Sequence, residues 1–136
     1  MNDLKTITIL FRATNTLSND IQQQVNELGL SLSSFMALEA LYHKGAMSVA
    51  SLQNKVLIAN SSLSYVIDQL AQKGYITIIS DTHDKRKRMC SLTASGQELM
   101  SDVYEKHVAR QRIRLNRLTD HEELLLQHLL KKIGLD

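Results

Sequence analysis

A change of periodicity in the middle of the chain constrains the fold more than any other feature. Up to Gly74, apolar residues recur at the three- and four-residue spacing of amphipathic helices. Residues 75–79 then read YITII, a short β-branched run that is typical of a strand. Residues 89–92 alternate in polarity and predict a second strand. The sequence therefore predicts one β-hairpin within an otherwise helical chain.

Composition supports a mostly helical, single-domain protein. The chain has 136 residues and no proline, whereas an all-β fold would carry more turn-forming residues. A single cysteine rules out an internal disulfide and fits a reducing compartment. No charged-then-apolar leader opens the chain, and no apolar run is long enough to cross a bilayer. We therefore expect a cytoplasmic protein with no membrane partner.

The first 74 residues predict four helices. The first covers residues 4–28 and stops at Gly29, and Ser33 or Ser34 is expected to cap the second, which ends near Gly45. Ser48 starts a short third helix, residues 57–60 form a turn, and the fourth helix follows, capped by one of two polar residues, Asn60 or Ser61. Two short helices joined by a tight turn form a helix-turn-helix pattern. Taken alone this signal is weak, since any helical hairpin in a core resembles it.

Two more helices are predicted after the hairpin. Thr93 is expected to cap a long helix that runs to about Leu118. The segment 119–122, Thr-Asp-His-Glu, is a capping box that opens a final helix. A hairpin that follows a helix-turn-helix makes a winged helix, so the loop between the two strands becomes the tip of the wing.

Four consecutive cations, residues 85–88, lie at this expected tip. Like charges repel, so packing alone gives no reason to place them together. Either the loop is a solvated turn, or an anionic partner binds it. Its position on a winged helix favours DNA, because cations on a wing neutralise phosphates.

The sequence resembles the MarR family of bacterial transcription regulators. The wing matches the family pattern D-x-x-D-x-R through Asp81, Asp84 and Arg86, and the pattern L-T-x-x-G follows at residues 92–96. Residues 63–76, LSYVIDQLAQKGYI, resemble the family's recognition helix and first wing strand. The likeness covers nearly the whole chain.

This resemblance implies a mostly α fold with a small β-hairpin wing. It implies one MarR-type domain, residues 1–136, with a winged helix-turn-helix at 33–92 and a long connecting helix at 93–118. Residues 1–30 and 119–136 would be mainly dimerisation helices. The implied function is a homodimeric regulator, in the first place a repressor, that reads a pseudo-palindromic site in double-stranded DNA and that a small-molecule effector can release.

The candidate DNA-binding residues fall into two groups. The recognition-helix group is Asn60, Ser61, Ser62, Ser64, Tyr65 and Gln69. The wing group is Asp84, Lys85, Arg86, Lys87 and Arg88. The resemblance implies that Arg86 enters or borders the minor groove and that Asp84 holds its guanidinium by a bidentate pair.

The recognition helix departs from the family in having no basic residue between Lys55 and Lys73. Its serines and glutamines can bind phosphates or base edges, and glutamine suits adenine in the major groove. Asp68 would repel phosphate, so we expect it to orient a neighbouring side chain. The departure bears on the target sequence rather than on DNA binding itself.

Two further groups of residues are expected to form the dimer contacts and a solvent-exposed face. The candidate dimer contacts are Leu4, Ile7, Leu126, Leu129 and Ile133. The arginines late in the long helix are expected to form a solvated face with ion pairs to acidic partners; they are Arg110, Arg112, Arg114 and Arg117.

Chemistry beyond DNA binding finds little support. Cys90 is expected to be a buried thiol, with oxidant sensing as the alternative. The five histidines are scattered, although three of them, His107, His121 and His128, lie on neighbouring predicted helices and could converge. No catalytic motif is present, so we expect no enzyme, metal or cofactor. The rival interpretation is a winged-helix protein-interaction module that dimerises or docks without reading DNA, favoured by the lack of basic residues in the recognition helix.

Overall fold

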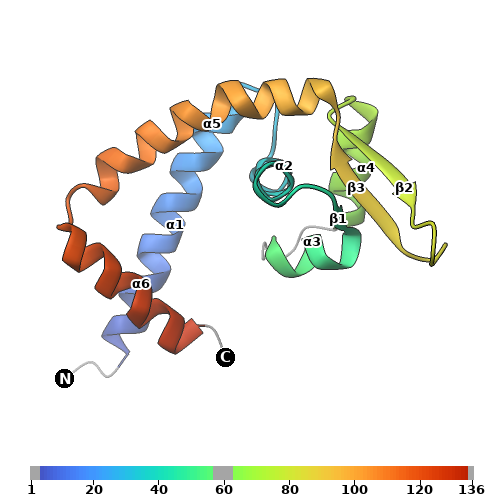
Figure 1. Ribbon diagram of the computed structural model, residues 1–136. Coiled ribbons are helices and arrows are strands. Elements are labelled where there is room, and N and C mark those ends of the chain that lie inside the picture. Colours follow the sequence, from blue (N-terminus) through green and yellow to red (C-terminus); the bar gives the residue numbers. More distant parts are fainter. Residues whose placement is uncertain (1–3, 57–62, 135–136) are drawn as a thin grey trace. The chain divides into compact units, whose positions relative to one another are not determined.

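The computed structural model of the protein describes residues 4–56 and 63–134 (Figure 1). These residues belong to two compact units, Met1–Ser101 and Asp102–Asp136, and the division lies within the long helix α5. Each unit is therefore described by itself.

The first unit holds the predicted helix-turn-helix and the hairpin. Its helices are α1 (Lys5–Asn26), α2 (Leu32–Lys44), α3 (Val49–Lys55), α4 (Leu63–Gln72) and the first part of α5 (Ala94–Leu115). Its strands are β1 (Met47–Ser48), β2 (Ile76–Ser80) and β3 (Arg88–Leu92). The predicted fold class, mostly α with a small β-hairpin, is confirmed.

The sheet has three antiparallel strands in the order β1-β3-β2. The hairpin β2–β3 was predicted, but β1 was not, and it pairs Met47 with Cys90 and Ser48 with Met89. A two-residue strand carries no periodicity that a sequence could reveal. Because β1 covers the other side of β3, the second wing strand is central in the sheet, which leaves it no free edge.

The core of the first unit lies between the helices and this sheet. Phe35 and Leu38 of α2 and Ile67 of α4 are fully buried, as is Cys90 of β3. Helix α4 therefore buries one stripe against α2 and the sheet, and its opposite face stays in solvent.

The helix caps that the sequence predicted are confirmed in part. Ser31, rather than Ser33 or Ser34, caps α2, since its hydroxyl accepts a hydrogen bond from the Ser34 amide at 3.1 Å. The predicted serines failed as caps because both are buried in the first turn of the helix. Ser48 caps α3 as predicted. The cap expected at Asn60 or Ser61 falls outside the described residues.

The L-T-x-x-G motif has a clear structural role at the junction of β3 and α5. The hydroxyl of Thr93 donates to the carbonyl of Gly74 at 2.6 Å and accepts from the amide of Gly96 at 3.0 Å, so it caps α5 as predicted. The Thr93 amide donates to the Tyr75 carbonyl at 3.0 Å. A side chain at Gly96 would overlap that same carbonyl. The glycine therefore lets α5 begin directly against the chain that enters β2.

The second unit comprises the rest of α5 and α6 (Asp120–Gly134). Helix α5 ends at Leu115 rather than near Leu118. The predicted capping box is present, because Thr119 and Glu122 each accept the other's backbone amide hydrogen bond. Hydrogen bonds from the amide and the side chain of Thr119 lower the pKa of the Glu122 carboxyl. Arg112 of α5 donates to both carboxylate oxygens of Glu123 at 2.7 and 2.8 Å.

None of the described helices is both long and apolar enough to cross a membrane.

Gly96→Ala should lower the free energy of unfolding by about 1 to 3 kcal/mol, because the new methyl group meets backbone rather than a mobile side chain. Gly134→Ala is the matched control, since a methyl group there meets nothing within 4 Å. Urea denaturation of both variants measures the difference. Equal midpoints for the two variants would contradict the proposed role of Gly96.

Candidate nucleic-acid interface

The wing loop, residues 81–87, is ordered by its own backbone and by two aspartates. The Asp81 amide donates to the Lys87 carbonyl at 2.7 Å, and the Lys87 amide donates to the Asp84 carbonyl at 2.9 Å. Oδ1 of Asp81 accepts from the His83 amide at 3.1 Å, and Oδ1 of Asp84 accepts from the Arg86 amide at 3.0 Å. Such Asx turns explain both aspartates of the D-x-x-D-x-R pattern as loop-forming residues.

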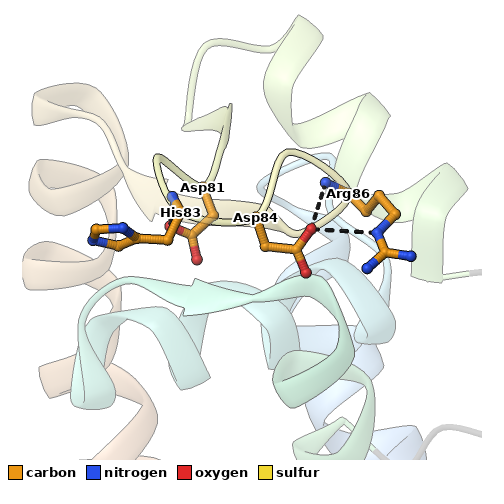
Figure 2. Close-up of polar contacts among 4 residues, drawn as sticks. All are labelled: Asp81, His83, Asp84 and Arg86. Carbon is orange, nitrogen blue, oxygen red and sulfur yellow. Dashed lines mark hydrogen bonds and ion pairs between the residues drawn. The ribbon is translucent and has the colours of Figure 1, made fainter.

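Arg86 projects from this loop into solvent (Figure 2), and its side chain is 94% exposed. Its Nε lies 3.4 Å from Oδ1 of Asp84, the same oxygen that accepts the Arg86 amide. The expected bidentate pair is therefore wrong. One aspartate oxygen serves both the turn and the side chain, so the terminal nitrogens of Arg86 do not bind Asp84.

The other wing cations differ in their surroundings. Lys85 and Lys87 are exposed at the tip. Arg88 lies at the start of β3, and its terminal nitrogen is 3.2 Å from Oδ1 of Asp68 on α4. This ion pair joins the wing to the recognition helix. It also identifies the neighbour that Asp68 was expected to orient.

The exposed face of α4 carries the described part of the predicted recognition group. Ser64, Tyr65 and Gln69 are exposed, whereas Val66 and Ile67 face the core. Nε2 of Gln69 donates a hydrogen bond to the hydroxyl of Tyr65 at 2.7 Å. The remaining predicted members, Asn60, Ser61 and Ser62, lie outside the described residues.

An open concavity of about 660 Å³ brings α3, α4 and the wing together. The wing contributes Asp84, Arg86, Lys87 and Arg88, and α4 contributes Ser64. Sequence reasoning missed the residues that β1 and α3 contribute, which are Ser48, Val49, Ala50 and Gln53. The pairing of Ser48 with Met89 places the start of α3 beside β3, and this two-residue strand left no pattern in the sequence that could have revealed it. The lining carries three cations and one aspartate, and one of the cations, Arg88, is paired with Asp68 of α4, so a net positive charge remains.

Residues with other possible chemistry lie outside this surface. Cys90 is fully buried, and burial raises the pKa of its thiol, an effect that nearby Arg88 partly opposes. A thiol in this state is a poor nucleophile. Within residues 4–56 and 63–134, no three metal-ligating side chains are grouped as a metal site would need.

The candidate dimer residues are exposed in both units. Leu4 precedes α1 and Ile7 lies in its first turn, with 66% and 45% of their surfaces exposed. On α6, Leu126, Leu129 and Ile133 are 40 to 60% exposed, and no described residue of that helix is buried. Exposed apolar surface of this extent on a helix is typical of a binding interface.

Comparison with known proteins shows which proteins this chain is similar to. The MarR family model matches residues 30–87. The HTH-type transcriptional regulator MhqR of Bacillus subtilis (strain 168) is 29% identical over 133 residues, which cover 98% of this chain and 92% of the relative.

Two solved structures share the fold. Bordetella bronchiseptica BpsR, described with the regulation of its DNA binding by 6-hydroxynicotinic acid, has a TM-score of 0.83 at 22% identity and covers 100% of this chain and 98% of its own. NadR in complex with 4-hydroxyphenylacetate has a TM-score of 0.84 at 20% identity, with 100% and 97% covered. Over residues 30–87 the chain therefore matches the MarR family model, and over nearly its whole length it is similar to an HTH-type transcriptional regulator.

Proposed function

We propose that this protein is a homodimeric repressor that binds a pseudo-palindromic site in double-stranded DNA through α4 and the wing. The observation that carries the proposal is the electropositive concavity, which α3, α4 and the wing form together. A solvated turn would not require its cations to lie beside the exposed face of a recognition helix. Duplex DNA supplies the matching charge, because its phosphates attract such a surface from both sides of a groove.

The two DNA-binding elements would have different tasks. Wing cations bind phosphates, which hold the protein on DNA without reading sequence. Arg86, with its side chain 94% exposed, is free to enter a narrow minor groove. The exposed face of α4, which carries no basic residue, reads base edges in the major groove.

The proposal of repression rests on the similarity to the MarR family. The proposal of dimerisation rests on that similarity and on exposed apolar surface. Two copies joined by a two-fold axis would present two α4 helices to half-sites about 34 Å apart, one turn of DNA. The exposed leucines of α6 and the apolar start of α1 supply apolar surface for such a pair.

We extend the proposal to a small-molecule effector of DNA binding. BpsR and NadR are described with 6-hydroxynicotinic acid and 4-hydroxyphenylacetate, both hydroxylated aromatic acids. This compound class is the first to test for release of duplex from the present protein.

The rival function is a protein-interaction module with the same fold, which the absence of basic residues from α4 favours. Binding to random duplex at low and at high salt separates the two functions. A DNA reader binds at low salt and loses affinity as salt rises. No binding at low salt would support the interaction module.

Lys85→Gln and Lys87→Gln should each weaken binding to all duplexes alike. Each should reduce the slope of log affinity against log salt by about 0.9 for every phosphate that the lysine neutralises, counted twice in a dimer. Lys106→Gln is the matched control, because this exposed lysine of α5 lies beside Asp102 and outside the wing sequence. Titrations at several salt concentrations measure the slopes. A reduced slope for the control alone would place DNA on another surface.

Arg88→Gln should weaken binding for a different reason, namely that it leaves Asp68 unpaired near DNA. The affinity should fall by about two- to fivefold, the range for an exposed ion pair. Asp68→Asn should restore affinity and the wild-type salt slope in the double variant. If the double variant instead shows the reduced slope of Lys85→Gln, then Arg88 binds phosphate itself.

Leu129→Asp should give a monomer at micromolar concentration, because it places a charge in the centre of the α6 apolar face. Leu124→Asp is the matched control, since Leu124 is exposed on nearly the opposite side of the same helix. Light scattering measures both masses. A wild-type monomer would contradict the homodimer, and a dimeric Leu129 variant would contradict the choice of α6.

A further inference from the structure

We infer that Tyr65 is a positioning residue that fixes the amide of Gln69 for reading adenine, so that each half-site carries a selected A·T pair. The inference rests on the proposed function and adds the base that α4 reads. Its basis is the 2.7 Å hydrogen bond from Nε2 of Gln69 to the Tyr65 hydroxyl on the exposed face of α4.

The pair is placed where a recognition helix meets bases. Tyr65 lies in the first described turn of α4 and Gln69 lies one turn later, so both project from the same face. The N-terminal part of such a helix is the part that contacts base edges. Tyr65 is 63% exposed, so its hydroxyl and ring edge are accessible to a bound duplex.

The hydrogen bond between Gln69 and Tyr65 leaves one donor and one acceptor of the Gln69 amide available, which is the combination that adenine requires. A glutamine amide has two N–H donors and one carbonyl acceptor. With one N–H held by Tyr65, the second N–H and the carbonyl remain, which can donate to N7 of adenine and accept from its N6 amino group. The phenol acts as an acceptor toward Gln69, so its own proton stays available for a neighbouring acceptor.

The Tyr65 hydroxyl holds the Gln69 side chain in one conformation before DNA binds. A free glutamine on a helix surface samples many rotamers, and holding one of them lowers the entropy lost on binding. It also opposes rotation of the amide, which would otherwise allow the side chain to match other bases. The hydroxyl therefore contributes to discrimination more than to total affinity.

The neighbouring charges favour adenine over guanine. Guanine is most often read by arginine or lysine, and α4 carries neither. The acidic neighbour Asp68 is occupied by Arg88, which limits its competition for a cytosine amino group. The amide of Gln69 is thus the group on this face best suited to a purine edge.

The experiment selects the preferred duplex from a random pool and then replaces individual A·T pairs with G·C. Wild type, Tyr65→Phe and Gln69→Ala are compared at one salt concentration, with Gln72→Ala as the matched control. Gln72 is the last residue of α4 and carries the same amide at the far end of the helix. Melting temperatures are recorded first to show that all variants fold.

Gln69→Ala should reduce the preference for A·T at one position of each half-site by roughly tenfold or more, the worth of a bidentate pair of hydrogen bonds. Tyr65→Phe should reduce the same preference by roughly two- to tenfold, the worth of one hydrogen bond. In separate salt titrations, both should bind random duplex with the wild-type slope, and Gln72→Ala should keep the full preference.

An unchanged preference in Tyr65→Phe would overturn the positioning role, and a selected site that lacks a Gln69-dependent A·T pair would overturn adenine reading. In either case the wild type still binds duplex. Failure of the wild type to bind any duplex at low salt would instead overturn the proposed function.

Discussion

The pairing of β3 with strands on both of its sides is the interaction on which the winged helix depends. The first residue of β3, Arg88, binds Asp68 of α4. The middle residue, Cys90, pairs with both Met47 and Ile78, and the end of the strand leads into the cap of α5. The strand therefore connects α4, the core and the long helix within five residues. An error in its register would displace all three together, because a shift of one residue turns every side chain to the other face.

The elements predicted from sequence were those with strong local signals. The change of period at Gly74 located the hairpin, and the capping box at Thr119 located α6, because both depend on residues a few positions apart. Strand β1 was missed since two residues have no period, and the cap of α2 was misplaced because several serines lie close together. The bidentate pair expected from the family was wrong, because Asp84 uses its oxygen to close a turn. Long-range contacts such as Asp68 with Arg88 depend on the fold and leave no local pattern.

Charge is distributed unevenly between the wing and α4, the two elements proposed to bind DNA. The wing holds its cations on a loop closed by backbone hydrogen bonds, whereas α4 carries amides, hydroxyls and one neutralised carboxylate. Non-specific attraction and sequence reading would thus depend on separate parts of the surface. An arginine on a reading helix can serve both purposes, because its charge attracts phosphates and its guanidinium binds guanine. Under the proposed function, substitutions in α4 would alter the preferred site with little change in the affinity for bulk DNA.

Cys90 has a practical consequence that follows from its position. It is the single cysteine of the chain and is fully enclosed at the centre of the sheet. A thiol reagent can reach it only when the sheet opens, so its rate of labelling measures the frequency of that opening in the unmodified protein. Labelling with and without duplex would show whether a DNA-bound wing makes the sheet behind it more rigid. The natural sequence thus contains a reporter of wing dynamics that needs no engineered probe.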